Sequence, residues 1–509
     1  MTDSEFAQRI TSAYTTTGAA VDLGRGVTGG TLEPEALVQV PASMLNRHGL
    51  IAGATGTGKT RTLQLMTEQM SKLGIPVFVS DIKGDLSGLA QVGEAGGKVG
   101  ERVTELGLSG WAPGAFPTQF LSLGGNGPGV PVRASVASFG PQLLAKVLGA
   151  NETQRSSLSL VFAYADGKGL ALLDLADLRA VLTYLTSEDG KAELTSIGGL
   201  SKATAGVLLR SITELEMQGG TSFFGEPELD VHDLMSTTAE GLGVVSCLEL
   251  AAVQDKPKLF STFLLWLLAE LFEELPEVGD LDQPKLVFFF DEAHLLFADA
   301  SDAFLDQVAQ TVRLIRSKGV GVFFVTQLPD DVPDAVLAQL GNRVQHALRA
   351  FTPRDAKALK AAVTTYPKTS DYDLEEDLTQ LGTGEAMVTI LSERGAPTPV
   401  VWTRLRPPTS SMSALATDEI GRLAEASALW PTYATPFDRE SARELLARKS
   451  GVPAPVETEP ATAPRQKRAA SPEKDDDGNV VTDYLKSREG RAMVNNVVRG
   501  VFGLLKKQR

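Results

Sequence analysis

The sequence is poor in cysteine, in long apolar runs and in net positive charge. Its single cysteine, Cys247, cannot form an internal disulfide. The longest candidate for a membrane segment, residues 259 to 272, is interrupted by Ser261, Thr262 and Glu270, so no integral membrane segment is predicted. A net charge of −15 disfavours nonspecific coating of DNA, although a local basic surface would not show in a net count.

The start of the chain also lacks the features of a secretion signal. The segment MTDSEFAQRI has no basic start followed by an apolar stretch. We therefore expect a cytoplasmic protein. At 509 residues the chain is too long for one ordinary domain, and its composition, 43% hydrophobic and 22% charged, is that of a globular protein. Two or three structural units are expected.

Short apolar runs alternate with amphipathic helices, which predicts an α/β fold with a mainly parallel central sheet that is buried on both faces. The strand signals are LIAG, IPVFVSD, GVVSCLEL, KLVFFFD, GVGVFFVTQ, RVQHALRA, GEAMVTIL and TPVVWTRL. The predicted order is an N-terminal segment with the first part of the core over 1–140, a helical insertion over 141–235, the second part of the core over 236–405, and a helical extension over 406–451. A disordered linker over 452–480 and a basic amphipathic C-terminal helix over 481–509 complete the prediction.

One segment matches the phosphate-binding pattern G-x-x-x-x-G-K-[ST] in full. It consists of Gly53, Ala54, Thr55, Gly56, Thr57, Gly58, Lys59 and Thr60, between the run LIAG and a helix that begins near Arg61. The glycines let backbone N–H groups turn toward phosphate oxygens. Lys59 supplies charge to the β and γ phosphates, and the Thr60 hydroxyl can ligate Mg²⁺. The segment predicts a site for ATP and Mg²⁺, with Arg61 as a further nucleotide-binding residue.

A second motif is an apolar strand, residues 286 to 290, that ends in two acids. Asp291 is the candidate ligand of Mg²⁺, and Glu292 is the candidate catalytic residue that polarises the attacking water. His294 completes the string DEAH, but the arginine-rich motifs of the RNA helicases of that name are missing. Asp81 also ends a predicted strand. It fits two roles equally well, support of the metal or water and formation of a turn.

A third apolar strand, residues 321 to 326, ends at Gln327. Because parallel strands end at one edge of a sheet, Gln327 is predicted beside Asp291, where it can sense the γ-phosphate. Arg316 precedes it by eleven residues and is the candidate for an arginine that reaches into the site of a neighbouring subunit. Arg313 and Arg343 are alternatives, and a solvent-facing arginine without such a role is a further one.

These residues resemble the HerA, FtsK and TrwB-like ATPases, and most closely the bacterial HerA-like helicase-domain proteins. The resemblance covers about residues 40 to 405. Its marks are LIAGATGTGKT, VFVSDIKGDLSGL, LLAKVLGANETQ, FFGEPELDVHDLM, FFFDEAHLLF and the block from VRLIRSKGVGVFFVTQ to RAFTPRDAKAL. The resemblance implies a RecA-like P-loop NTPase fold, a homo-hexameric ring with ATP between subunits, and double-stranded DNA as the partner. It also places the sensor glutamine on Gln327 and the trans-acting arginine on Arg316.

Two functions from different classes fit this sequence. The first is a ring-forming motor that couples ATP hydrolysis to DNA translocation or helicase-like activity. The alternative is an ATP-controlled assembly or regulatory ATPase that acts on an unknown protein partner through the helical insertion or the C-terminal tail. A GTPase is a remote third reading, because no N-K-x-D guanine motif is present. The tail, with seven basic and two acidic residues over 483 to 509, can dock on an acidic partner, an anionic membrane surface or DNA. Alternatively, its apolar face can pack on its own or a neighbouring subunit.

Overall fold

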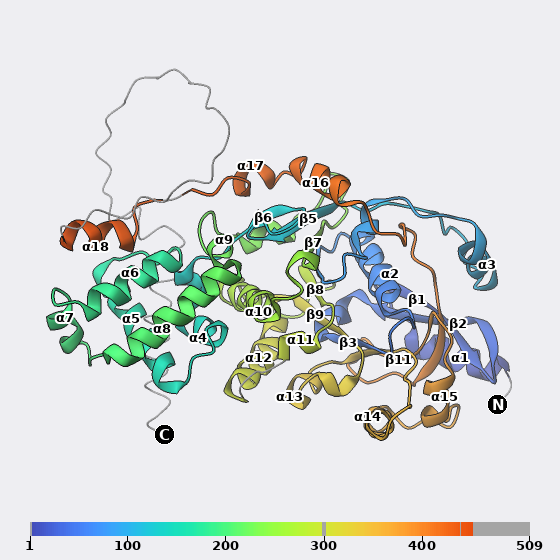
Figure 1. The fold of residues 1–509 in the computed structure, drawn as a ribbon. Helices are drawn as coiled ribbons and strands as arrows, with labels where there is room; N and C mark the ends of the chain where they lie inside the picture. Colours follow the sequence, from blue (N-terminus) through green and yellow to red (C-terminus); the bar gives the residue numbers. More distant parts are fainter. Residues whose placement is uncertain (1–2, 298–301, 438, 451–509) are drawn as a thin grey trace, which may run out of the picture. The chain divides into compact units, whose positions relative to one another are not determined.

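The computed structural model describes residues 3–297, 302–437 and 439–450. The chain forms two compact units (Figure 1). Unit 1 comprises Met1–Arg133 and Pro227–Pro436, and unit 2 comprises Ala134–Glu226 and Phe437–Arg509. The predicted linker over 452–480 and the predicted helix over 481–509 lie outside the described residues. No described helix is both long and apolar enough to cross a bilayer.

Unit 1 contains the sheet, which has twelve strands within the described residues in the order β2-β1-β12-β11-β10-β3-β9-β8-β4-β7-β5-β6. The strands are β1 (Ala20–Thr28), β2 (Thr31–Pro41), β3 (Gly49–Ala52), β4 (Val77–Asp81), β5 (Thr118–Leu123), β6 (Val130–Val132), β7 (Val245–Glu249), β8 (Leu286–Phe290), β9 (Val320–Thr326), β10 (Asn342–Gln345), β11 (Glu385–Thr389) and β12 (Val401–Leu405). All neighbours from β10 to β6 pair in parallel, and those from β2 to β10 pair antiparallel. The prediction of a mainly parallel α/β sheet is confirmed.

The central strands are largely apolar because both faces of the sheet are covered. In β8 the ring of Phe289 contacts Phe323 at a centroid distance of 5.1 Å, on the face that packs against α2 (Lys59–Lys72). Phe290 lies on the other face and stacks on Phe324 at 5.6 Å. Phe324 in turn contacts Phe297 of α11 (His294–Phe297). A strand with these contacts cannot alternate apolar and polar residues.

Two strands that the apolar pattern did not indicate, β1 and β2, form a hairpin at the antiparallel end of the sheet. Their turn consists of Gly29 and Gly30, with φ values of 54° and 79°. Two central residues with positive φ are the requirement of the type I′ hairpin turn, and glycine meets it without strain. Helix α1 (Asp3–Tyr14) packs its apolar residues into the same core.

The remaining helices of unit 1 flank the sheet or extend its connections (Figure 1). They are α3 (Gly97–Glu105), α10 (Pro257–Glu274), α12 (Asp302–Ile315), α13 (Asp334–Leu337), α14 (Pro353–Thr364), α15 (Leu374–Gln380), α16 (Thr417–Glu425) and α17 (Trp430–Tyr433). Helix α16 contributes Ile420 to the core shared by α2 and the sheet. Thus the segment after β12 returns to the face of the sheet that α2 covers.

Unit 2 is helical within its described residues. Its helices are α4 (Val136–Val147), α5 (Glu152–Lys168), α6 (Leu175–Thr186), α7 (Lys191–Ser196), α8 (Lys202–Leu215), α9 (Thr221–Phe223) and α18 (Ala442–Ser450). Polar residues begin several of them, since the side chains of Asn151, Asp174 and Ser201 each accept a backbone N–H of the first turn. The predicted boundaries of a helical insertion at 141 and 235 stay a prediction.

Candidate functional site

The phosphate-binding pattern forms a loop between β3 and α2, at the carboxyl edge of the parallel strands. Gly53, Gly56 and Gly58 have φ values of 152°, 79° and 115°, which side chains rarely adopt. A Cβ atom on Gly53 would lie 2.5 Å from the Cβ atom of His346. Thr55 and Gly56 are exposed at the tip of the loop. The loop therefore depends on glycine both for its backbone conformation and for its close approach to β10.

Lys59 begins α2 and turns back over the loop. Its Nζ atom donates hydrogen bonds to the carbonyl oxygens of Gly53, at 2.6 Å, and Ala54, at 3.2 Å. Burial lowers the pKa of Lys59, and nearby Glu292 opposes that shift. Thr60 follows at the first turn of the helix and is half-buried. A buried ammonium group at a helix N-terminus is suited to bind the oxygens of a polyphosphate.

Asp291 follows β8 at the same edge of the sheet. Its N–H donates to Ser80 Oγ at 3.2 Å, and its Oδ2 atom is buried without a hydrogen-bond partner among the described residues. Burial, and then the charge of Glu292, raise the pKa of Asp291 to about 7. An unpaired buried carboxylate oxygen is costly unless a cation satisfies it. Asp291 therefore fits a magnesium ligand, together with the Thr60 hydroxyl.

Glu292 has a φ of 47°, unusual for a residue that is not glycine. Its Oε1 atom forms an ion pair with Lys83, and its Oε2 atom lies 3.4 Å from His294 Nδ1. Burial alone would raise the pKa of Glu292, but the contact with Lys83 outweighs burial and lowers it. The carboxylate is thus held beside Asp291 by a lysine to which the sequence analysis assigned no role.

Gln327 directly follows β9, the strand that lies between β3 and β8. Thr326 pairs with Ala52, and its carbonyl oxygen accepts the N–H of Gly53 at 3.2 Å. The side chain of Gln327 is exposed. The structure therefore brings the loop, Gln327 and the two acids of β8 to one edge on three neighbouring strands.

Arg316 lies at the other end of β9. It belongs to the short helix η6 (Arg316–Lys318), which precedes the strand, and it pairs with Asp280 at 3.4 Å. The seven residues of β9 span about 23 Å at roughly 3.3 Å per residue. Arg313 is exposed on α12, and Arg343 of β10 donates to Thr365 Oγ1 at 2.5 Å. The structure does not bring Arg316 or Arg313 to the phosphate-binding loop of the same chain.

A pocket of about 210 Å³ lies beside α2 and reaches from the phosphate-binding loop to the segment after β12. Its lining is Gly58, Arg61, Thr62, Leu65, Lys98, Val99, Arg102, Thr383, Gly384, Leu405, Arg406, Pro407, Pro408 and Met412. Arg61 is fixed at the pocket by hydrogen bonds to Gln64 Oε1, at 2.8 Å, and to the carbonyl oxygen of Met412, at 2.6 Å. Apolar walls with cationic residues suit a flat heteroaromatic base and a ribose.

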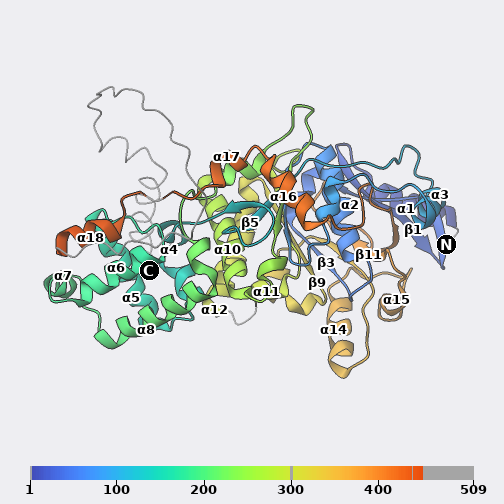
Figure 2. The ribbon, with the colours of Figure 1, turned by 45° about the horizontal axis from the view of Figure 1, so that its top comes forward.

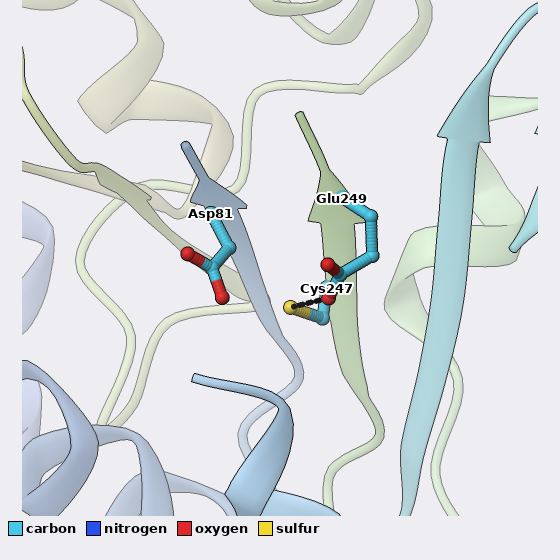
Figure 3. A group of neighbouring side chains, drawn as sticks. All are labelled: Asp81, Cys247 and Glu249. Carbon is cyan, nitrogen blue, oxygen red and sulfur yellow. Dashed lines mark hydrogen bonds between the residues drawn. The ribbon is translucent and has the colours of Figure 1, made fainter. Parts of the chain in front are cut away.

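Asp81 forms a turn. Its carboxylate accepts the backbone N–H groups of Gly84, at 2.7 Å, and Leu86, at 2.8 Å, with longer contacts to the two neighbouring residues. Figure 3 shows that it faces Cys247 and Glu249 of the adjacent strand β7. Burial, followed by the charge of Asp81, raises the pKa of Glu249 to about 8. Cys247 Sγ donates to Glu249 Oε1 at 3.4 Å. These hydrogen bonds to backbone N–H groups are the contacts that a turn-forming aspartate makes.

The chain resembles known proteins in sequence and in fold. The model of the helicase HerA-like C-terminal family matches residues 29–507. The chain belongs to this family. By family and fold it is a HerA-like P-loop ATPase, and the predicted recognition is confirmed.

Individual relatives are distant. A probable helicase of Methanocaldococcus jannaschii, MJECL08, is 30% identical over 154 residues, and the aligned part spans only 28% of each chain. The unbound bacterial conjugative coupling protein TrwBdeltaN70 is 14% identical, with a TM-score of 0.50 over 80% of this chain and 94% of its own. TrwB in complex with ADP and Mg²⁺ has the same identity and TM-score over 79% and 94%. These structures establish the shared fold.

Proposed function

We propose that this HerA-like chain binds and hydrolyses ATP with Mg²⁺ at the carboxyl edge of β3, β9 and β8. The observation that carries the proposal is the buried, unpaired Oδ2 atom of Asp291 at the edge where Lys59 closes the phosphate-binding loop. Lys59 and the loop N–H groups would bind the phosphates, and Thr60 and Asp291 would hold Mg²⁺, which neutralises phosphate charge. TrwB, which shares the fold, is known in complex with ADP and Mg²⁺.

In this proposal Glu292 accepts a proton from the attacking water, and Gln327 orients that water or contacts the γ-phosphate. Gln327 follows β9, which pairs with β3, and Glu292 follows β8, which pairs with β9, so both emerge at the edge of the sheet that carries the loop. The base and ribose would occupy the pocket beside Arg61, because it starts at Gly58 and its walls are largely apolar. The free thiol of Cys247 and the use of ATP fit a reducing cytoplasm.

We further propose that hydrolysis drives movement along double-stranded DNA. The support from this chain is a basic surface on and before α14, defined by Arg349, Phe351, Lys357 and Lys360. All four side chains are exposed, Phe351 at 86%, and α14 stands out from the rest of unit 1 (Figure 2). Cations bind the phosphates of the DNA backbone, so this surface offers contacts that the net charge of −15 does not.

We also propose that the chain assembles into a ring of identical subunits. The family resemblance implies six of them. Its support is the position of Arg316 at the amino end of β9, on the edge away from its own loop. An arginine there can act on transition-state charge only in a neighbouring subunit.

The test is the ATP hydrolysis rate of protein of known assembly mass, with and without long double-stranded DNA at two salt concentrations. Stimulation by DNA that fades with salt supports the motor. Hydrolysis that is equal with and without DNA in a well-formed ring would favour the protein-directed alternative. Lys59→Ala should lower the rate by about 10²-fold or more, as expected for one phosphate-stabilising donor. Lys72→Ala, at the other end of α2, is the matched control.

A further inference from the structure

Lys83 has no role assigned by the phosphate-binding pattern or by the Asp291–Glu292 motif, yet it contacts the proposed general base. It follows β4, which pairs with β8, so it emerges at the same edge of the sheet as Glu292. The carboxylate of Asp81 fixes the turn that carries it, since Asp81 Oδ1 accepts the N–H of Lys83 at 3.2 Å and that of Gly84 at 2.7 Å. Gly84 has a φ of 73°, which closes the turn. The backbone of Lys83 is therefore held in place, and its side chain extends to Glu292.

The ammonium group of Lys83 pairs with one carboxylate oxygen of the proposed general base, Glu292. Oε1 of Glu292 is occupied by the ion pair, and Oε2 is buried and faces His294 at 3.4 Å. A general base must have a lone pair within hydrogen-bond reach of the proton that it removes. The ion pair takes one lone pair of Oε1 and holds the carboxylate in one orientation, while Oε2 has no hydrogen-bond partner among the described residues.

The two partners of the ion pair differ in freedom. The side chain of Glu292 is 8% exposed and that of Lys83 is 47% exposed. The long lysine side chain can therefore move its charge to solvent or to a phosphate oxygen at little cost, whereas Glu292 is confined. The strained φ of 47° at Glu292 further indicates a residue that its surroundings hold in place.

We propose that Lys83 is a positioning residue that restrains Glu292 in an idle arrangement, and that turnover requires the Lys83–Glu292 ion pair to open. This inference rests on the proposed role of Glu292 in ATP hydrolysis. Lys83 is not a catalytic residue in this scheme, because it acts through Glu292. Its departure frees Oε1 to accept a proton from water, and the lysine is then available to the anionic nucleotide.

The test compares the steady-state kinetics of the full chain with those of Lys83→Gln and Lys83→Arg. Lys83→Gln should raise the kcat without DNA by at least about threefold, a small part of the roughly 10²–10⁴-fold that a positioned general base supplies. The KM for ATP should stay unchanged, and stimulation by DNA should shrink by the same factor. Lys83→Arg keeps the ion pair and should keep the low rate. Lys202→Gln, on exposed α8 of unit 2, is the control.

A rate of Lys83→Gln that is unchanged or lower than that of the parent, in protein of unchanged Tm, would overturn the restraint. Failure of the proposed function gives a different result. If Glu292→Gln hydrolyses ATP as fast as the parent, then Glu292 is not the base and the ATPase assignment of this site fails. If the parent hydrolyses ATP but DNA has no effect, the motor fails, while the rise in kcat of Lys83→Gln still reports on the restraint.

Discussion

The Nε2 atom of His346 lies 2.9 Å from the Oγ1 atom of Thr62, which places a fully buried histidine against the first turn of the helix that follows the phosphate-binding loop. The N–H of His346 donates to the carbonyl oxygen of Ala52, and its Cβ occupies the space that a side chain on Gly53 would need. Burial, then the charge of Lys59, lowers the pKa of His346 to about 3. His346 is therefore a neutral support beneath the loop.

Replacing this support should weaken both the fold and the nucleotide site. His346→Ala leaves a cavity under the loop and removes the partner of Thr62, so we expect a loss of about 2–4 kcal/mol in the free energy of unfolding, typical of large-to-small core changes. The KM for ATP should rise more than kcat falls. Urea unfolding and steady-state kinetics measure the two effects. His232→Ala, an exposed histidine, should change neither, and an unaltered KM in His346→Ala would contradict the supporting role.

Because Glu249 of β7 is buried, we predict that the stability of the fold depends on pH. The pKa of Glu249 is about 8 in the folded protein and about 4.3 in an unfolded chain. Between these values only the unfolded chain has lost the proton, so the free energy of unfolding falls as pH rises, by up to about 1.4 kcal/mol per pH unit. Glu249→Gln removes the titrating group and should remove this slope. Above about pH 8 the variant should therefore be more stable than the parent.

Burial is the main cause that raises the pKa of Asp81 to about 6 and that of Asp291 to about 7, and both groups titrate in parent and variant alike. The effect of Glu249 is therefore the difference between the two proteins over the window from pH 6 to 8. Tm values of parent and variant across that window provide the measurement. The exposed Glu277→Gln is the matched control, since its carboxylate is exposed in the folded protein. A Tm difference between Glu249→Gln and the parent that stays constant from pH 6 to 8 would rule out a protonated Glu249.

The apolar runs predicted β3, β4 and β7 to β12, whose residues are mostly buried and need no tertiary information. The short strands β5 and β6, at the end of the parallel block, were not predicted. The hairpin of β1 and β2 was not predicted, although its turn signal, Gly29-Gly30, is present in the sequence. Its strands have one exposed face and polar residues, so a search for continuous apolar runs does not find them. An alternating pattern on either side of the glycine pair is the signal that applies there.

The residues of the candidate site also differ in how far the sequence alone predicts them. Lys59 and Asp291 belong to contiguous motifs whose chemistry is readable from spacing. Lys83 and His346 reach the site from strands far away in sequence, and only the order of strands in the sheet brings them there. Arg316 illustrates a third case, since its proposed role requires a second subunit.

The basic surface of α14 predicts a salt-dependent contact with DNA. Lys357→Ala should weaken binding to double-stranded DNA of any sequence and lower the slope of log K against log salt by about 0.9 for one lost phosphate contact. Binding titrations at several salt concentrations measure the slope. Lys202→Ala, an exposed lysine of unit 2, is the control. An identical slope for Lys357→Ala and parent would exclude α14 from the DNA contact.

The position of Arg316 predicts complementation between two inactive variants. Arg316→Ala removes a charge from the neighbour's site but leaves its own loop intact, whereas Lys59→Ala destroys its own site but retains Arg316. In a mixed ring, an interface that pairs the loop of an Arg316→Ala subunit with Arg316 of a Lys59→Ala subunit is complete. Mixing should therefore restore a fraction of the hydrolysis rate that neither variant has alone. The ion pair with Asp280 is exposed and weak, so releasing Arg316 to a neighbour costs little.

Two controls make this result specific to Arg316. The same mixture with Arg313→Ala tests the exposed arginine three residues earlier, and Arg343→Ala tests the arginine whose Nη1 atom is hydrogen-bonded to Thr365. If Arg316→Ala alone keeps the parent rate, or if mixing restores nothing in rings shown to contain both variants, the trans role is excluded for Arg316. If the hydrolysis rate is restored when Arg313→Ala replaces Arg316→Ala in the mixture, the trans role belongs to Arg313, because both arginines precede the amino end of β9.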